Sequence, residues 1–224
     1  MLRFLPILLA VAYGLIAYRF SVWRTQRELD ARATPLADAS LAPQMAAMAK
    51  ALDVPRLKVN LYDIPTVNGL AAPDGRIFIT RGLYQMYLDG RITGEELSSV
   101  IAHELGHVAL GHTRRRMIDF SGQNALRMAL AAVLSRIIPG FGPLLAGGLT
   151  SLLAARMSRE DEFAADSYAT ALMLKAGMGV APQLSLFEKL GGDGRQVATT
   201  AWLATHPATP DRLAAIRANA ARWA

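Results

Sequence analysis

The sequence has 224 residues, a length that suits one domain with a hydrophobic core and an appendage at one end. Hydrophobic residues make up 52% of the chain and the mean hydropathy is +0.23, so part of the apolar surface is expected to contact lipid. Because the chain has no cysteine, disulfides, thiolate metal ligands and cysteine nucleophiles are excluded, and any metal must be held by nitrogen and oxygen. The net charge of +6 suits anionic lipid headgroups at least as well as nucleic acid.

The chain begins with an apolar segment. Residues 4–18 carry no charge, and as a helix they would be about 22 Å long, short of the ~30 Å hydrocarbon core of a bilayer. The side chain of Arg19 can reach the headgroups and apolar residues continue to Trp23, which predicts a span of about 20 residues. No small-residue cleavage site follows directly, so residues 1–24 are interpreted as a membrane anchor in preference to a removable signal sequence. The arginines that follow favour a cytoplasmic location for the rest of the chain, with the opposite face as the alternative.

A polar linker and an amphipathic helix are expected over residues 25–56. Apolar residues recur at helical spacing from Leu41 to Leu52, and Pro55 marks the end of this helix. Packing in a core accounts for its apolar face.

A small sheet is expected next. Apolar and polar residues alternate over residues 57–61, and a second apolar run at 77–79 follows a Pro-Asp-Gly turn, so we predict an antiparallel sheet with a third strand at 67–71. From Gly82 onward the signals are helical. The predicted fold class is therefore α+β, mostly helical, with one domain over residues 57–224.

One hydrophobic stretch interrupts the helical part. Residues 137–155 carry no charge, but prolines and glycines crowd their first two-thirds, which makes a straight transmembrane helix a poor fit. Together with residues 125–134, the stretch is interpreted as a hydrophobic helical hairpin over about residues 125–156. The hairpin either covers a functional site or enters the membrane, and the sequence favours neither.

A metal-binding pattern lies on one of the predicted helices. Thr93 and Glu96 form a capping box that starts the helix. His103 and His107 are four residues apart, about 40° around the helix, so both imidazoles can reach one ion. Glu104 lies beside them, where a glutamate can act as a base on a water activated by zinc. Chance alone would place this five-residue pattern in well under about one in a hundred such chains.

A catalytic zinc needs a third protein ligand and an open position for water. His112 lies five residues beyond His107, on another side of the helix, and is interpreted as a helix-surface or helix-end residue. His206 precedes a proline in a predicted loop, and spacing leaves it open as a ligand. Glu162 and Asp166 are four residues apart on a later helix, so one could bind the metal while the other accepts a hydrogen bond from a ligand imidazole.

Three motifs in order along the chain carry a resemblance to a known family. They are His-Glu-Leu-Gly-His at 103–107, Glu-Phe-Ala-Ala-Asp at 162–166 and Thr-His-Pro at 205–207. Over about residues 57–217 the chain resembles the zinc metallopeptidases that include the bacterial heat-shock protease HtpX and the eukaryotic CAAX prenyl proteases. The resemblance implies a zincin-like domain, one catalytic Zn²⁺ and hydrolysis of peptide bonds.

The same resemblance implies roles for individual residues. His103, His107 and Glu162 would bind zinc. Glu104 would be the general base that takes a proton from the zinc-activated water, and His206 would donate a hydrogen bond to the developing oxyanion.

Other residues would support this centre or bind substrate. By resemblance, Asp166 would hold a ligand histidine in place, and Arg212 would lie close to the site. Family members bind a peptide by strand addition to an edge strand, which here corresponds to Val67, Asn68, Gly69 and Leu70. The family usually has Asn-Ala where this chain has Asn68-Gly69.

The resemblance also implies a place and a task. With one apolar span, the chain looks like a reduced bacterial member, single-pass in the inner membrane, that contacts membrane lipid and cleaves unfolded or membrane-associated proteins in quality control. The alternative function is a membrane-bound chaperone or adaptor with a structural zinc site. Nucleic acid is not an expected partner, because the arginines at 114–116 more simply suit a helix end or lipid headgroups.

Overall fold

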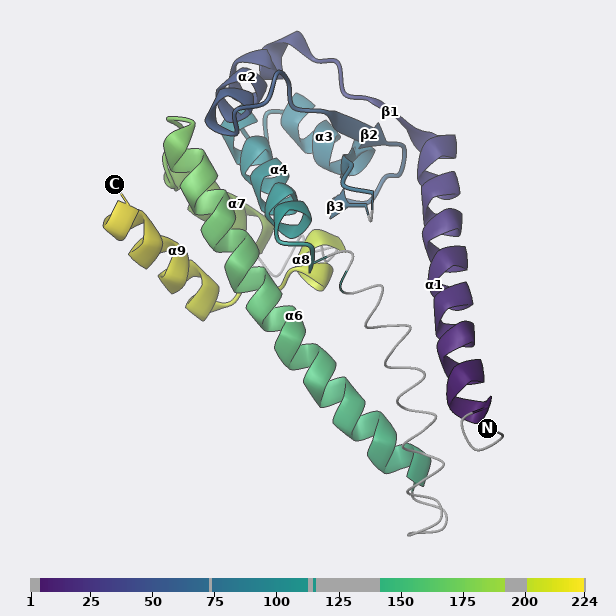
Figure 1. Ribbon diagram of the computed structural model, residues 1–224. Helices are drawn as coiled ribbons and strands as arrows, with labels where there is room; N and C mark the ends of the chain where they lie inside the picture. The colour runs from purple at the N-terminus through teal and green to yellow at the C-terminus, as the bar shows by residue number, and fades with distance from the viewer. Residues whose placement is uncertain (1–4, 73, 113–114, 116–141, 192–200, 224) are drawn as a thin grey trace. The chain divides into compact units, whose positions relative to one another are not determined.

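The computed structural model describes residues 5–72, 74–112, 115, 142–191 and 201–223 (Figure 1). The chain divides into two compact units, each made of two segments. The first unit consists of residues 1–28 and 111–161, and the second of residues 29–110 and 162–224. The three motifs all lie in the second unit.

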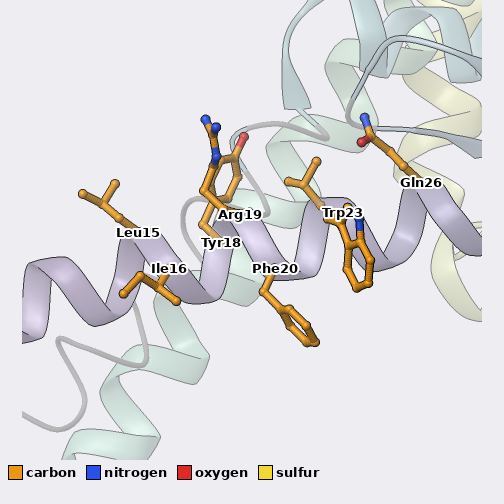
Figure 2. A pocket seen from close by; sticks show the side chains of 8 residues that line it. Leu15, Ile16, Tyr18, Arg19, Phe20, Trp23 and Gln26 are labelled. Carbon is orange, nitrogen blue, oxygen red and sulfur yellow. The ribbon is translucent and has the colours of Figure 1, made fainter.

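Helix α1, Leu5–Arg32, supplies the amino-terminal part of the first unit. Several of its large apolar side chains are exposed: Tyr13, Leu15, Ile16, Phe20 and Trp23. Figure 2 shows the open groove that four of them line together with polar groups of Arg19 and Gln26. No helix within the described ranges is long and apolar enough to cross a membrane, and the predicted anchor span over residues 1–24 is not confirmed.

The predicted hairpin falls partly outside the described residues, which resume at residue 142. From there α6, Gly142–Lys175, is one continuous helix that carries the acidic motif. At the end of the first unit, Asp161 Oδ1 lies 3.4 Å from His112 Nε2 and 3.5 Å from Arg115 Nη1. His112 is therefore paired with a carboxylate of its own unit.

The second unit contains a four-stranded sheet in the order β1-β2-β4-β3. Its strands are β1 (Ala33–Pro35), β2 (Val59–Tyr62), β3 (Gly69–Ala71) and β4 (Ile77–Thr80). The last three confirm the predicted strands, but the prediction of an antiparallel sheet is wrong for one pair, because β2 and β4 are parallel. The reason is the strand order. Strand β3 lies on the outer side of β4 and pairs antiparallel with it, so β2 and β4 are direct neighbours that run in the same direction. Strand β1, which pairs antiparallel with β2, was not predicted.

Side chains alternate between the two faces of this sheet. Ile77 and Ile79 of β4 enter the main core, whereas Phe78 enters a smaller cluster on the other face. On β3, Ala71 packs against the main core and Leu70 against the smaller cluster. Helix α4 contacts β3 and β4 (Figure 1). The main core therefore lies between the sheet and α4.

The other regular elements among the described residues of the second unit are helices, which agrees with the mostly helical α+β fold. They are the 3-10 helix η2 (Ala39–Leu41), α2 (Ala42–Ala51), α3 (Arg81–Leu88), α4 (Gly94–Ala109), the end of α6, α7 (Ala181–Gly191), α8 (Ala201–Thr205) and α9 (Pro210–Trp223). Helix α2 confirms the amphipathic helix expected between Leu41 and Leu52.

The predicted capping box fixes the start of α4. The Thr93 N–H donates to Glu96 Oε2 at 2.7 Å, and the Glu96 N–H donates to Thr93 Oγ1 at 3.2 Å. Glu96 also accepts hydrogen bonds from Ser185 Oγ at 2.6 Å and Lys189 Nζ at 2.8 Å. These bonds tie α7 to the beginning of the helix that carries both histidines.

Candidate metal centre

The centre forms where α4 and α6 approach each other closely. A Cβ atom placed on Gly106 would lie 3.0 Å from the Cα and carbonyl oxygen of Ala165 and 3.2 Å from the Cβ of Tyr168. Since ordinary carbon contacts lie near 3.5–4.0 Å, a larger residue at 106 would push the two helices apart. Glycine between the two histidines of the motif therefore allows the acidic residues of α6 to reach them.

Three predicted ligands converge at this contact. His103 Nε2 lies 3.1 Å from His107 Nε2 and 3.3 Å from Glu162 Oε2, and His107 Nε2 lies 3.5 Å from Glu162 Oε1. A tetrahedral zinc ion bound at 2.0–2.1 Å keeps its ligand atoms about 3.3–3.4 Å apart. The three distances bracket that value, so the side chains fit one zinc ion without rearrangement of the backbone.

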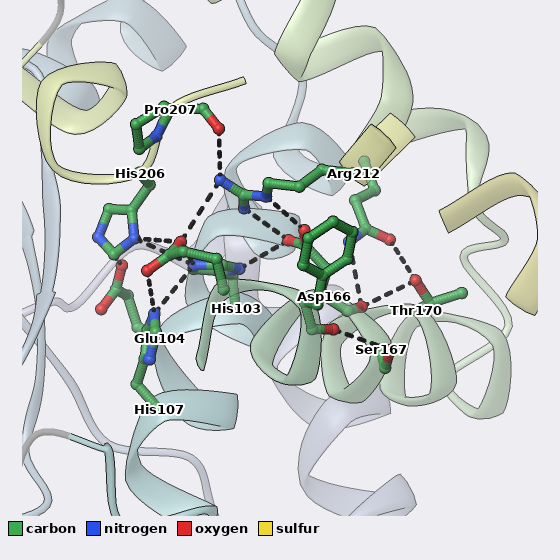
Figure 3. A network of polar contacts seen from close by, with 12 residues as sticks. His103, Glu104, His107, Asp166, Ser167, Thr170, His206, Pro207 and Arg212 are labelled. Atoms are coloured by element: carbon green, nitrogen blue, oxygen red, sulfur yellow. Dashed lines mark hydrogen bonds and ion pairs between the residues drawn. The ribbon is translucent and has the colours of Figure 1, made fainter. Parts of the chain in front are cut away.

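His206 lies beside the same three residues (Figure 3). Its Nδ1 is 2.8 Å from Glu162 Oε2 and 3.3 Å from His103 Nε2, while its Nε2 is 3.6 Å from Glu104 Oε1. One ligand atom from each of His103, His107, Glu162 and His206 lies within 4.8 Å of the others, and all four residues are buried. His206 therefore fits either a fourth ligand or a group next to the fourth position.

Asp166 orients one of the histidines. Its Oδ1 lies 3.0 Å from His103 Nδ1. A hydrogen bond to the carboxylate holds the proton on Nδ1 of the neutral ring and leaves Nε2 as the ligand atom. Asp166 thus lies where the spacing of the acidic motif predicted it, and it can hold His103 as a metal-binding imidazole would need to be held.

Arg212 links Asp166 to the rest of the centre, as Figure 3 shows. Its Nε and Nη2 donate to the two oxygens of Asp166 at 2.6 and 2.8 Å. Its Nη1 donates to the Pro207 carbonyl at 2.8 Å and lies 3.4 Å from Glu162 Oε2. One guanidinium therefore contacts Glu162, the Asp166 carboxylate that pairs with His103, and the residue that follows His206.

The charges of the centre suit a divalent cation. Three buried carboxyl groups, those of Glu104, Glu162 and Asp166, lie beside one buried arginine, Arg212, so acidic side chains outnumber the guanidinium by two. Burial lowers the pKa of His103, but hydrogen bonds to Asp166 and Glu162 outweigh burial and raise that pKa to about 9. Burial raises the pKa of both Glu162 and Asp166, but hydrogen bonds outweigh it and lower both pKa values. The bonds are to His103 and His206 for Glu162, and to Arg212 and His103 for Asp166.

Glu104 lies at the side of the ligand cluster. Its side chain is buried, and Oε1 has no hydrogen-bond partner within the described part of the chain. A buried carboxylate oxygen without a partner is costly to a fold. The arrangement is therefore better suited to a group that exchanges protons with a water or substrate than to a structural residue.

The predicted substrate strand lies next to Glu104. Strand β3 is at one edge of the sheet. Two hydrogen bonds beside the strand show which of its residues face β4. The Thr80 N–H donates to the Asn68 carbonyl at 3.0 Å, and the Ala72 N–H donates to the Arg76 carbonyl at 2.8 Å. Because antiparallel pairing alternates along a strand, Asn68, Leu70 and Ala72 direct their N–H and C=O groups toward β4.

Residues between these positions direct their backbone groups outward. Gly69 and Ala71 therefore present N–H and C=O groups at the free edge of β3. Val67 points the same way, but its carbonyl accepts a hydrogen bond from the Trp202 N–H at 3.0 Å. Among the four residues expected to bind substrate, Gly69 has outward N–H and C=O groups without a hydrogen bond to the described residues. Ala71, which was not among the four, presents its N–H and C=O groups in the same way.

Trp202 is a residue of the centre that the sequence did not reveal. Its ring centroid lies 5.8 Å from that of His103 and 5.6 Å from that of His206, and the side chain is 2% exposed. Its only sequence signal is its place three residues before the Thr-His-Pro motif. The indole packs against two histidines of the centre, while the backbone N–H of Trp202 donates to Val67, two residues before β3.

Comparisons with known proteins identify the family. A family model described as peptidase family M48 matches residues 35–220. The chain is 33% identical over 199 residues to metalloprotease LoiP of Escherichia coli K12, covering 85% of this chain and 75% of LoiP. It is 32% identical over 183 residues to metalloprotease YcaL of the same organism, covering 78% and 68%. It is also 26% identical over 167 residues to the mitochondrial metalloendopeptidase OMA1 of Danio rerio, covering 69% and 34%.

These matches confirm the metallopeptidase expected from the motifs and zinc as its cofactor. The narrower likeness to HtpX and the prenyl proteases is not confirmed. A family model that covers most of the chain, with two bacterial metalloproteases at about one-third identity, places the zinc-fitting cluster in a known enzyme family. The chain belongs to peptidase family M48 and is a zinc metallopeptidase.

Proposed function

We propose that this centre hydrolyses peptide bonds with His103, His107 and Glu162 as the three zinc ligands and Glu104 as the general base. The observation that supports it best is the pairing of two features. The nearest nitrogen and oxygen atoms of the three ligand side chains lie 3.1–3.5 Å apart, with His103 closest to Oε2 and His107 closest to Oε1 of Glu162. The neighbouring Glu104 has a carboxylate oxygen without a hydrogen-bond partner among the described residues. A ligand set of three leaves the fourth position for water, as a catalytic site requires.

When bound, zinc lowers the pKa of a coordinated water and polarises the scissile carbonyl. Glu104 accepts the proton of the attacking water and delivers a proton to the leaving amine. Asp166 keeps His103 in the tautomer that presents Nε2. Arg212 contacts both Asp166 and Glu162 and holds their side chains in place, so the ligands are already ordered before the metal binds.

His206 is assigned to the transition state in this proposal. Its Nε2 lies 3.6 Å from Glu104 Oε1, on the side of the centre where the reacting carbonyl must approach the base. An imidazole N–H there can donate to the developing oxyanion. Trp202 packs against the ring of His206 and limits its rotation.

The peptide is proposed to bind as an added strand on β3. Gly69 and Ala71 offer two N–H and two C=O groups along the free edge, and the bond from Trp202 to Val67 closes one end of that edge. Main-chain bonds of this kind require an extended substrate and tolerate many side chains. Unfolded or membrane-associated proteins are therefore the proposed substrates, in a quality-control role.

Attachment to a membrane is proposed through α1. Leu15, Ile16, Phe20 and Trp23 are between 51% and 69% exposed on that helix. Arg19 lies among them in sequence, and Arg24 and Arg27 follow. Exposed apolar side chains interleaved with arginines suit a lipid surface with anionic headgroups. Cosedimentation with liposomes should occur for the full chain and be lost when Phe20 and Trp23 are both changed to serine; unchanged sedimentation of that variant would contradict attachment through α1.

A structural zinc site in a chaperone or adaptor is a second candidate, because His206 Nδ1 also fits the fourth vertex. Four protein ligands would close the centre to water. The Glu104 oxygen that lacks a hydrogen bond among the described residues favours the catalytic assignment, since a closed structural site has no use for it.

Cleavage of unfolded casein by the zinc-loaded full chain tests the proposed function. Removal of zinc with a chelator should abolish cleavage, and stoichiometric zinc should restore it. Glu162→Ala should lose zinc and activity together, whereas the matched Glu188→Ala change at an exposed position of α7 should affect neither. A Glu162→Ala variant that keeps both zinc and activity would remove Glu162 from the ligand set, and a zinc-loaded wild type without peptidase activity would contradict the proposal.

A further inference from the structure

Strand β3 lies unusually close to the helix that carries the base. A Cβ atom built on Gly69 would be 2.6 Å from Val100 Cγ1, 3.3 Å from Glu104 Cγ and 3.4 Å from Glu104 Oε1. Carbon atoms in contact normally lie about 3.5–4.0 Å apart. No side chain larger than hydrogen fits at position 69 while β3 and α4 keep their places.

The neighbour that excludes a side chain is fixed in position. Val100 is fully buried on α4 and belongs to the main core, so turning its side chain would press it against its core neighbours. It is also one helical turn before Glu104, on the face of α4 that contacts β3. A methyl group on residue 69 would therefore move the strand and not the valine.

The same residue faces the substrate with its backbone. Gly69 directs its missing side chain toward α4 and its N–H and C=O groups toward the free edge of β3. Any outward shift of β3 would thus carry the peptide-binding groups away from the carboxylate of Glu104.

We propose that Gly69 is a positioning residue: the absence of a side chain lets the peptide-binding edge lie directly against α4 and sets its distance from Glu104. This inference rests on the proposed function, because it assumes that a peptide pairs with β3.

The size of the effect follows from the contact distance. To bring a Cβ atom from 2.6 Å to an ordinary contact with Val100 Cγ1, β3 must move outward by about 1 Å. A displacement of this size between a bound substrate and a catalytic group lowers kcat/KM on the order of a hundredfold. None of the three zinc ligands lies on β3, so the zinc content is unaffected.

The experiment compares Gly69→Ala, Val100→Ala and the double variant in the zinc-loaded full chain. Gly69→Ala should bind one zinc ion per chain and lose about tenfold to a hundredfold in kcat/KM, with a higher KM because the binding edge has moved. Val100→Ala removes Cγ1, the atom that the new methyl would meet, so the double variant should recover to within about threefold of Val100→Ala alone. Gly94→Ala, the same change at the start of α4 beside the flexible Gln44 side chain, is the matched control and should keep wild-type kinetics.

Recovery in the double variant separates positioning from a general loss of structure. Val100→Ala removes further core atoms, so a variant that was merely destabilised would become worse, whereas one with a displaced strand would recover. If Gly69→Ala fails to fold, a double variant that folds and cleaves still supports the contact, and one that stays unfolded overturns it. An active wild type with an equally active Gly69→Ala variant would overturn this inference alone. A zinc-loaded wild type that cleaves no peptide would overturn the proposed function, and this inference with it.

Discussion

Replacing Asp166 with asparagine removes a negative charge that accepts hydrogen bonds from both Arg212 and His103. The carboxylate receives two hydrogen bonds from Arg212, at 2.6 and 2.8 Å, and one from His103 Nδ1, at 3.0 Å. The Arg212 and Asp166 side chains are only 3% and 2% exposed. Loss of one partner from a buried ion pair costs about 3–5 kcal/mol. Arg212 keeps its contacts with Glu162 and the Pro207 carbonyl, so we expect about 3 kcal/mol, the lower end of that range.

The metal should be affected as well. A neutral amide at 166 holds the His103 ring less firmly, and loss of such a partner lowers metal affinity by about 10–100-fold. Urea denaturation of the zinc-stripped protein measures the first effect, and zinc competition with a chromophoric chelator measures the second. Asp211→Asn, an exposed change in the first turn of α9, is the control and should cost about 0.5 kcal/mol or less. Wild-type stability together with wild-type zinc affinity in Asp166→Asn would refute this reasoning.

Three further outcomes follow from the centre. His206→Ala should keep zinc and lower kcat by about 10²–10³-fold, as for loss of an oxyanion donor; loss of zinc, by metal analysis, would make His206 a ligand instead. Gly106→Ala should separate α4 from α6, destabilise the fold by about 1–3 kcal/mol and weaken zinc binding; unchanged zinc affinity would contradict the close-packing argument. The His103 pKa is raised from 6.5 to about 9, so its pairing stabilises the zinc-stripped fold fully below pH 6.5, and this contribution is lost as the pH rises through about 9. Thermal melts of the stripped protein from pH 6 to 10 should show this decline, and a stability that rises over that window would contradict it.

Local signals explain why the helix of the two histidines was predictable. The capping box at Thr93 and Glu96 and the apolar periodicity after it depend only on neighbours in sequence, and both appear in the structure as expected. The histidines of the motif follow from the same helical geometry. Strand β1 escaped prediction because it has three residues, Ala33–Pro35, and ends in a proline.

Long-range relations account for the remaining differences. Strands β2 and β4 pair in parallel because β3 lies on the far side of β4 and not between them, and no local sequence pattern encodes this order. Glu162 and Asp166 have the spacing of an ordinary solvated helix face, and the structure buries both against α4. The packing of Trp202 against two histidines and the close contact at Gly69 depend on tertiary structure, which a single sequence does not show.

Glu104 is the residue on which the assignment of a catalytic centre depends, and its exchange for glutamine is the most direct test. The measurement is kcat/KM for one unfolded-protein substrate, with wild type and Glu104→Gln each loaded with one zinc ion per chain. Loss of a general base should lower the rate by about 10²–10⁴-fold, while zinc content and melting temperature stay at wild-type values. A zinc-loaded Glu104→Gln variant that cleaves at the wild-type rate would contradict the proposed mechanism.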